Sequence, residues 1–288
     1  MKIVKIAKKS GGTRTIYVQD PRSCGKFREV ATLLTTQCQQ LAPAGVVRGF
    51  MPGESPVTNA AAHASSKFIL NMDLADFFDH CDKEKIAAGL MPLDVLHVPD
   101  AWLPVGKKGA AKKSADELAA RAVYDGAARQ GLSSSPMAAN IAALPMDRDI
   151  LSNLPANVIY TRYADDLTFS ADDPALLKII RQQVPNIAKR HGQEVKPSKT
   201  RMQAAVAGRM VVTGVAVAGG KLHATKEVRR RARAAAHNCK KLVLQIADFM
   251  RAGQPVAAGI LWRANWRQFS RARGLAEWCK LTLPKTHS

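Results

Sequence analysis

Two neighbouring aspartates, Asp165 and Asp166, stand between two short apolar runs, residues 158–160 and 167–169. Adjacent carboxylates repel each other, so a folded chain keeps them together only with help from solvent, a turn or a cation. Aspartate is common in turns, and turn chemistry alone would account for a bare pair. This pair is not bare, because Asp73 ends a further apolar, strand-like run. The three carboxylates therefore need an explanation as a set.

Three carboxylates delivered by separate strands could bind divalent metal ions. Magnesium prefers octahedral oxygen coordination, and carboxylates are among its usual protein ligands. Two such ions close together can activate an attacking 3′-hydroxyl and stabilise the leaving pyrophosphate. Asp73 on one strand, with Asp165 and Asp166 on a neighbouring hairpin, would supply such a site for nucleotidyl transfer.

The charge balance indicates a polyanionic partner. Lys and Arg number 43 against 23 Asp and Glu, which gives a formal net charge of +20 over 288 residues. A chain this basic repels itself, and each phosphate that a Lys or Arg neutralises adds affinity through counterion release. Solubility and an acidic membrane surface are the alternatives. Nucleic acid is favoured, because the sequence contains neither a run of roughly 18 apolar residues nor a recognisable membrane-surface helix.

The densest basic segment lies near the end of the chain, over residues 226–241. At helical spacing Lys226, Arg230 and Arg233 share a face, as do Arg229 and Arg233. We expect a helix whose basic residues bind RNA phosphates, with a solvated basic face as the alternative. The predicted RNA-binding residues are Lys226, Arg229, Arg230 and Arg233. Core packing is the preferred explanation for Trp262 and Trp266 on the next helix, and base stacking is the alternative.

These residues must be positioned by strands and helices in a mixed order, which indicates an α+β fold with an antiparallel sheet partly covered by helices. Strands are predicted at residues 68–72, at 158–170 as a strand–turn–strand, at 210–217 and as a pair within 2–21. Helices are predicted at residues 26–42, 83–90 (capped by Asp82), 136–151, 174–191 and 225–250. Residues 91–115 are expected to form an irregular, basic surface insertion.

Four motifs in order make the chain resemble the reverse transcriptases. Residues 68–78 resemble the first palm motif of that family, and Tyr163-Ala164-Asp165-Asp166 resembles its YxDD box. Between them, residues 130–140 resemble the QGxxxSPxxxN motif, and residues 196–200 resemble the palm motif that follows the box. One four-letter box is a weak signal, but four motifs in the right order are specific.

The resemblance implies a right-hand polymerase fold with fingers, an antiparallel palm with helices, and a small α-helical thumb. On this basis we expect the fingers at residues 1–65 and 85–145, the palm at 66–84 and 146–220, and the thumb at 221–288.

The resemblance also implies roles for individual residues. Asp73, Asp165 and Asp166, with the backbone carbonyl of Leu74, would hold two Mg²⁺ ions, with Mn²⁺ as the alternative ion. Phe78 falls where the family keeps an aromatic side chain that blocks a ribose 2′-hydroxyl, so deoxynucleotides would be preferred. The residues expected to bind dNTP or template are Arg14 (with Lys8 or Lys9), Phe78, Gln130, Asn140 and Lys199. Core packing is an alternative for Phe78, and a solvated surface for Arg14 and Lys199.

Two further motifs resemble those of retron reverse transcriptases. Residues 59–63 match their NAxxH signature, and residues 212–214 match their VTG signature. Asn59 and His63 are accordingly expected to bind RNA, with a hydrogen-bonded core histidine as the alternative for His63. The resemblance implies a bacterial enzyme that copies part of a structured noncoding RNA (msr–msd) into branched RNA–DNA (msDNA). We expect it in the cytoplasm, because residues 1–9 contain no continuous apolar stretch of signal-peptide length.

In that family the DNA is primed from a guanosine 2′-hydroxyl of the RNA itself, and the product acts in defence against phage. The implied partners are the cognate RNA, its cDNA, dNTPs and an effector or toxin protein, with a larger assembly and no membrane. Two alternatives stay open: a reverse transcriptase of another bacterial defence system that uses a different primer, and a catalytically idle RNA-binding scaffold.

Overall fold

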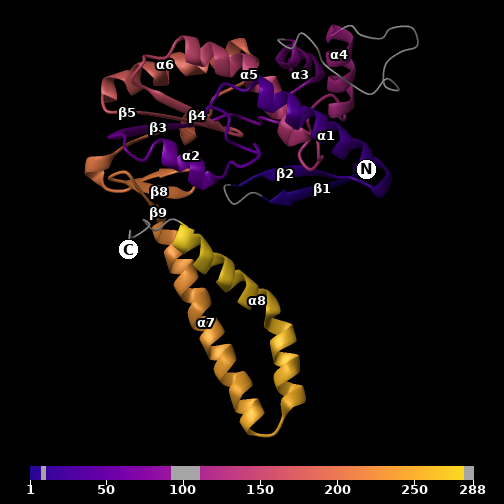
Figure 1. Ribbon diagram of the computed structural model, residues 1–288, viewed down its shortest axis with the longest axis vertical. Helices are drawn as coiled ribbons and strands as arrows, with labels where there is room; N and C mark the ends of the chain where they lie inside the picture. Colours follow the sequence, from indigo (N-terminus) through magenta and orange to yellow (C-terminus); the bar gives the residue numbers. More distant parts are fainter. Residues whose placement is uncertain (8–10, 92–110, 282–288) are drawn as a thin grey trace.

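A computed structural model describes residues 1–7, 11–91 and 111–281 of the chain. The expected role of Lys8 or Lys9 and most of the predicted 91–115 insertion lie outside these residues. Figure 1 shows a body of sheets and helices from which a long two-helix hairpin extends. In the described part of the chain, no helix is long and apolar enough to cross a membrane.

A four-stranded antiparallel sheet lies at the centre of the body, in the order β4-β5-β3-β6. Its strands are β3 (Phe68–Asp73), β4 (Ile159–Tyr163), β5 (Asp166–Ala171) and β6 (Arg201–Ala204). The helices α5 (Ser135–Ser152) and α6 (Pro174–Arg190) cover one face (Figure 1). Short 3₁₀ turns at Pro197–Lys199 and Ala205–Ala207 flank β6.

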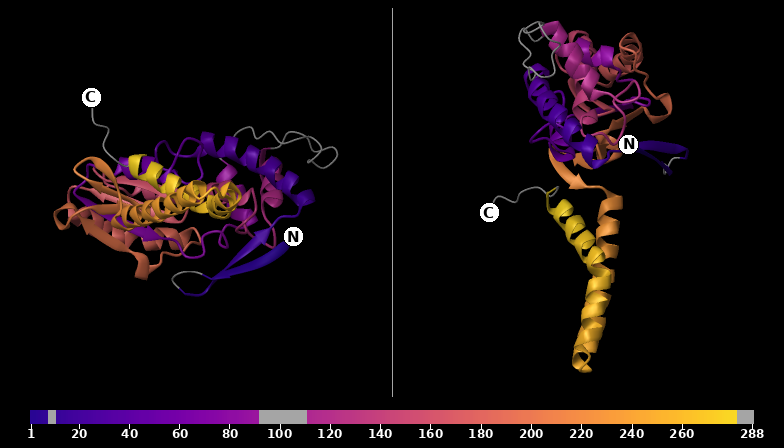
Figure 2. Two further views of the ribbon diagram at one scale, coloured as in Figure 1. Left: turned by 90° about the horizontal axis from the view of Figure 1, so that it is seen from below. Right: turned by 90° about the vertical axis from the view of Figure 1, so that its right-hand side faces the viewer.

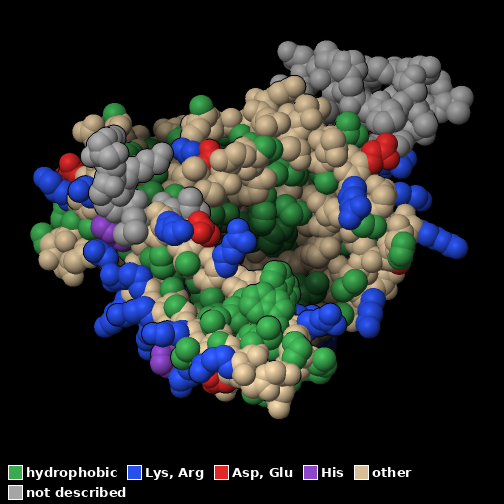
Figure 3. Space-filling view, turned by 60° about the horizontal axis from the view of Figure 1, so that its bottom comes forward, with side chains coloured by type: hydrophobic (Ala, Val, Ile, Leu, Met, Phe, Trp, Pro, Cys, Tyr) green, Lys and Arg blue, Asp and Glu red, His purple; other side chains and the backbone are tan. Residues whose placement is uncertain are grey.

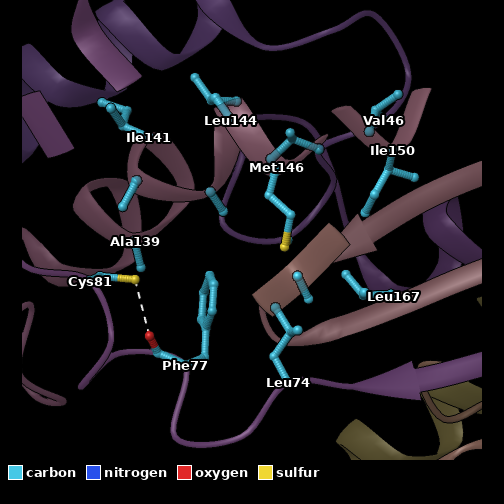
Figure 4. Close-up of a cluster of buried hydrophobic side chains, with 14 of the residues drawn as sticks. Val46, Leu74, Phe77, Cys81, Ala139, Ile141, Leu144, Met146, Ile150 and Leu167 are labelled. Atoms are coloured by element: carbon cyan, nitrogen blue, oxygen red, sulfur yellow. Dashed lines mark hydrogen bonds between the residues drawn. The ribbon is translucent and has the colours of Figure 1, made fainter. Parts of the chain in front are cut away.

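The main core lies between this sheet, the loop that follows β3, and α5. Figure 4 shows Leu74 and Phe77 from that loop, Ala139, Ile141 and Met146 from α5, and Leu167 from β5 converging on one another. The Cys81 thiol donates to the Phe77 carbonyl at 3.0 Å. The buried residues of this loop begin with Leu74, directly after Asp73. Packing in the core therefore fixes the position of the carboxyl end of β3.

Beside the central sheet, the body contains a ribbon and a group of helices. The ribbon pairs β1 (Lys2–Ala7) with β2 (Thr13–Val18). The helices are α1 (Pro21–Leu41), α3 (Lys83–Leu90) and α4 (Ala111–Ala122). Helix α1 begins five residues before the predicted start, because Asp20 accepts from the Ser23 amide at 2.9 Å and caps the helix ahead of its apolar stripe. Residues 111–115, expected to be irregular, begin α4.

A smaller sheet lies on the other face of the palm, in the order β7-β8-β9. Its strands are β7 (Met210–Val212), β8 (Val215–Ala218) and β9 (Lys221–Ala224), and α2 (Pro56–Ala62) packs against it. The chain then forms the hairpin of α7 (Lys226–Arg251) and α8 (Pro255–Leu281). The right-hand view of Figure 2 shows the hairpin projecting away from the body, as Figure 1 does. The side chain of Thr225 caps α7 by accepting from the Val228 amide.

Candidate active site

The three aspartates meet at one edge of the palm sheet, as the sequence predicted. Asp73 is the last residue of β3 and lies opposite Asp166, the first residue of β5. The Leu74 amide donates to the Asp165 carbonyl at 2.9 Å, which joins the two strand ends. Ala164, at the turn before the pair, has a φ of +56°, a left-handed conformation that is costly for alanine. The turn must therefore be held by its surroundings.

The backbone of Gly49 packs directly against this turn. A Cβ added at Gly49 would lie 2.3 Å from the Ala164 nitrogen, closer than any real side chain approaches. The amides of Arg48 and Gly49 donate to the Arg162 carbonyl at 2.8 and 3.4 Å. Only glycine allows the two backbones to approach this closely.

A buried network supports the same turn from the core side. The Arg162 guanidinium and the Asp147 carboxylate are both completely buried, and Nη2 lies 2.7 Å from Oδ2. Arg162 Nη1 also donates to Asn140 Oδ1 at 2.9 Å, and Asn140 Nδ2 donates to the Gly49 carbonyl at 2.7 Å. The network therefore connects α5, β4 and Gly49 behind the carboxylates.

This placement corrects the prediction for Asn140. Its side chain is fully buried and its amide group is bonded within the protein, so it does not face a nucleotide or template. It instead helps to hold the turn that carries Asp165 and Asp166. The sequence did not identify Gly49, Arg162 or Asp147 as parts of the site. The one signal for this network was Arg162, a charged residue within the predicted strand.

The carboxylate cluster raises the proton affinity of its own members. Burial, then the neighbouring charges of Asp165 and Asp73, raise the pKa of Asp166 to about 6. Burial and the charge of Asp73 also raise the pKa of Asp165. Both shifts arise because negative charges are crowded in a poorly solvated place. A bound cation would relieve them.

Lysines supply positive charge beside Asp73. Lys199 Nζ lies 2.7 Å from Asp73 Oδ2, and Lys196 Nζ lies 3.8 Å from Oδ1. The hydrogen bond to Asp73 is the largest cause of a raised pKa of Lys199. The Lys199 side chain is 51% exposed.

The donor set fits divalent metal ions. Asp73, Asp165 and Asp166 offer carboxylate oxygens at neighbouring strand ends, and Asp73 Oδ1 is buried without a hydrogen-bond partner among the described residues. As the side chains stand, no three His, Cys, Asp or Glu in the described ranges are grouped closely enough to hold an ion. Lys199 lies against Asp73 Oδ2, so we expect it to move when a cation binds.

A cavity of about 660 Å³ opens beside Asp165. Its lining includes Arg14 from β2 and Gln130 from the segment before α5, together with Phe78 and Lys199. The structure thus brings four of the five residues predicted to bind dNTP or template to one space; Asn140 is the exception.

The structure shows how two of these residues, Gln130 and Phe78, are held in place. The Gln130 carbonyl accepts from the Tyr17 amide at 2.7 Å, which ties the QGxxxSPxxxN motif to β2. A Cβ at Gly131 would lie 2.4 Å from the Tyr17 carbonyl oxygen, so this contact requires glycine. Phe78 is partly buried with its ring 6.3 Å from that of Phe50, whereas Phe77 is in the core.

A second cavity, of about 440 Å³, also borders the carboxylates and shares Ser198 and Lys199 with the first. It is lined by Asn71, Asp73 and Asp166 together with Arg201 and Thr213. Arg201 and Thr213 were not among the predicted site residues. Asp165 therefore lines the cavity that Arg14 and Gln130 also line, and Asp73 and Asp166 line the cavity that reaches the small sheet at Thr213.

The retron-type motifs are structural in this chain. His63 is fully buried, and its ring nitrogens lie 2.7 Å from Thr161 Oγ1 and 2.8 Å from Ser170 Oγ. Burial, then the charge of Arg48, lowers the pKa of His63 to about 4. Asn59 is also buried and reaches Thr213 Oγ1 of the VTG motif at 3.4 Å. The prediction that Asn59 and His63 contact RNA is therefore corrected: they join α2 to the palm and the small sheet.

The basic residues of α7 are exposed, as both a phosphate-binding face and a solvated basic face require. The side chains of Lys226, Arg229, Arg230 and Arg233 are all exposed. Figure 3, viewed with the hairpin brought forward, shows Lys and Arg side chains along the flanks of the molecule. The preferred interpretation of Trp262 and Trp266 as core residues is wrong, since they are 43% and 58% exposed.

Comparison with known proteins gives a consistent result. A family model described as reverse transcriptase (RNA-dependent DNA polymerase) matches residues 6–241. The chain is 32% identical over 237 residues to the retron Mx65 reverse transcriptase of Myxococcus xanthus, an alignment that covers 81% of this chain and 54% of that protein. It is 32% identical over 257 residues to the retron Mx162 reverse transcriptase of the same organism, covering 82% and 52%. The chain thus spans about half the length of the curated relatives it matches.

Solved structures with a similar fold include two yeast telomerases. The telomerase of Candida albicans, in complex with the TWJ fragment of telomeric RNA, superposes with a TM-score of 0.57 at 14% identity over 78% of this chain and 46% of that chain. A truncated apo telomerase of Candida tropicalis gives 0.55 at 15% identity over 78% and 54%. At these identities the likeness shows the fold alone, and it confirms the predicted polymerase fold.

Proposed function

The chain belongs to the reverse transcriptase (RNA-dependent DNA polymerase) family, and on that basis we propose that it synthesises DNA on an RNA template. The observation that carries this proposal is the convergence of Asp73, Asp165 and Asp166 at one sheet edge beside a cavity lined by both fingers and palm residues. The division into fingers, palm and thumb at the sequence boundaries given above is part of the proposal.

In this proposal the residues around the larger cavity bind the incoming nucleotide. Arg14 and Lys199 attract its phosphates, and Phe78 packs where a ribose 2′-hydroxyl would lie, which favours deoxynucleotides. Gln130 contacts the nucleotide or template from the fingers side. Lys199 is close enough to the carboxylates to give a proton to the leaving pyrophosphate.

The family uses divalent metal ions. Asp73, Asp165 and Asp166, with the Leu74 carbonyl, would hold two Mg²⁺ here, and Mn²⁺ is the alternative. When bound, such ions activate the attacking hydroxyl and neutralise the leaving group. The protein itself fixes the carboxylates through Gly49 and the Arg162–Asp147 network, holds Lys199 beside them, and provides two adjoining cavities for the nucleotide and the growing strand.

We further propose that the chain acts as a retron reverse transcriptase. It would copy part of a cognate msr–msd RNA into branched msDNA, self-primed from a guanosine 2′-hydroxyl, in the bacterial cytoplasm. The similarity to named retron reverse transcriptases supports this, as does the contact between the NAxxH and VTG motifs. An anti-phage role with an effector or toxin protein in a larger assembly belongs to the same proposal.

The test is to purify the chain from cells that carry its cognate locus and to analyse the bound nucleic acid before and after RNase treatment. A small DNA joined to RNA by a 2′–5′ branch, absent from the Asp165→Asn/Asp166→Asn double variant, is the expected result. Unbranched DNA would keep the polymerase and reject the retron. Bound RNA without DNA from either protein would reject polymerisation and favour the scaffold.

A further inference from the structure

Helix α8 carries a row of aromatic side chains on the projecting hairpin. Trp262, Trp266 and Phe269 are spaced four and three residues apart, which places them along one side of the helix. The Trp262 ring is stacked on Phe269 at 4.5 Å between centroids and lies 6.2 Å from Trp266. Trp262 and Trp266 nevertheless remain 43% and 58% exposed.

Core packing does not explain this row. The hairpin has almost no interior: Ala258 is the one fully buried side chain among the described residues of α7 and α8. The hairpin contacts the body mainly at its base, where α8 meets β9 and Trp278 packs against the second core cluster. Two indole rings that are half exposed on a projecting element offer flat apolar faces to a ligand.

The charges around the row favour a polyanion. Arg263 and Arg267 each follow one of the tryptophans, and Arg273 lies on the same side of the helix as the aromatic row. The acidic residues of the hairpin stand toward its ends and are Glu227, Asp248 and Glu277. In Figure 3, hydrophobic side chains gather toward the centre of the view with Lys and Arg on both sides. An apolar row with Arg263, Arg267 and Arg273 close to it repels a basic protein and attracts phosphates.

We propose that this face of α8 binds a single-stranded segment of nucleic acid, with unpaired bases stacked on Trp266 and Trp262 and the backbone phosphates beside Arg263 and Arg267. Unpaired bases present the π-faces that an indole can stack on, whereas paired bases keep those faces covered within the helix. The site is separate from the basic face of α7, whose residues follow phosphates without needing exposed bases.

The proposal rests on the proposed function only for the class of ligand, nucleic acid. Binding is measured without nucleotides. A chain that failed to synthesise DNA would therefore still show whether this surface binds nucleic acid. Conversely, a polymerase that made no use of α8 would still extend a primer.

The experiment compares three labelled ligands by fluorescence anisotropy with the full chain: a single-stranded RNA, a strand of equal length made of abasic residues, and a blunt duplex. Trp266→Ala is expected to weaken binding of the single-stranded RNA by about 5- to 160-fold, the range that loss of one base stack gives. Binding of the abasic strand and the duplex should stay unchanged, because phosphate contacts remain.

Two further variants separate stacking from general damage. Trp266→Phe keeps a stacking ring and should restore most of the affinity, and Ile260→Ala, which truncates a neighbouring exposed apolar residue, should bind like the wild type. Equal binding of the single strand by wild type and Trp266→Ala would overturn the proposal, and so would an equal loss on all three ligands. Loss of self-association or of a protein partner, with RNA binding intact, would also reject it in favour of a protein-docking surface.

Discussion

Gly49→Ala should damage the active site without unfolding the protein. The added Cβ would lie 2.3 Å from the Ala164 nitrogen and 2.9 Å from the Tyr163 carbonyl carbon. Both are backbone atoms and cannot rotate aside as a flexible side chain would. The strand-turn that carries Asp165 must therefore shift, or Gly49 must withdraw from it.

The size of the effect follows from the distance. Ordinary contact begins at 3.4 Å, so relief of the clash requires a displacement of about 1 Å. A misplacement of about 1 Å in reacting groups costs on the order of 100-fold in rate. We therefore expect kcat for DNA synthesis on a primed RNA template to fall about 100-fold, with a smaller change in KM because the nucleotide-binding residues lie elsewhere.

The assay is steady-state primer extension, with thermal unfolding measured on the same preparations. Gly25→Ala is the matched control, because Gly25 lies within α1 and a Cβ there meets nothing within 4 Å. The control should keep full activity and gain up to about 1 kcal/mol of stability from its helix propensity. If Gly49→Ala were as active as the wild type, the turn would not be held by this contact and the reasoning would be refuted.

Three other changes test separate parts of the site. Phe78→Ala should raise incorporation of ribonucleotides relative to deoxynucleotides, measured as a ratio of kcat/KM values; an unchanged ratio would leave Phe78 with packing alone. Lys199→Ala should lower kcat yet tighten binding of Mn²⁺, measured by electron paramagnetic resonance, because Nζ no longer competes for Asp73 Oδ2; weaker Mn²⁺ binding would contradict this. The pKa of Asp166 is raised to about 6 in the folded protein. The free energy of unfolding of the metal-free protein should therefore fall as pH rises from about 4 through 6. Asp166→Asn should remove up to about 3 kcal/mol of that dependence in urea titrations, and an identical pH profile for both proteins would argue against the raised pKa.

Much of the palm could be predicted from the sequence because its signals are local. The apolar runs around Asp73 and the Asp165–Asp166 pair gave the strands and the turn, and Asp82 and Thr225 marked the starts of α3 and α7. The start of α1 was missed because the capping residue, Asp20, precedes the apolar periodicity by several residues.

The residues that hold the site in place could not be predicted, because they act through contacts between residues that are distant in the sequence. Nothing local distinguishes Gly49 from a loop glycine, and its role exists only because the turn at Ala164 lies against it. Asn140 and His63 were expected to meet ligands because motif positions say nothing about which way a side chain points. In the folded chain both point into the protein, where they bond to Gly49, Arg162, Thr161 and Ser170.

The most direct test of the central claim is DNA synthesis by the purified chain on a primed RNA template, compared with the Asp165→Asn/Asp166→Asn double variant. The account predicts template-directed incorporation of dNTPs that requires a divalent ion and is lost in the double variant, while the variant keeps its fold by circular dichroism. Equal synthesis by both proteins, or none by either under conditions where the RNA is bound, would contradict it.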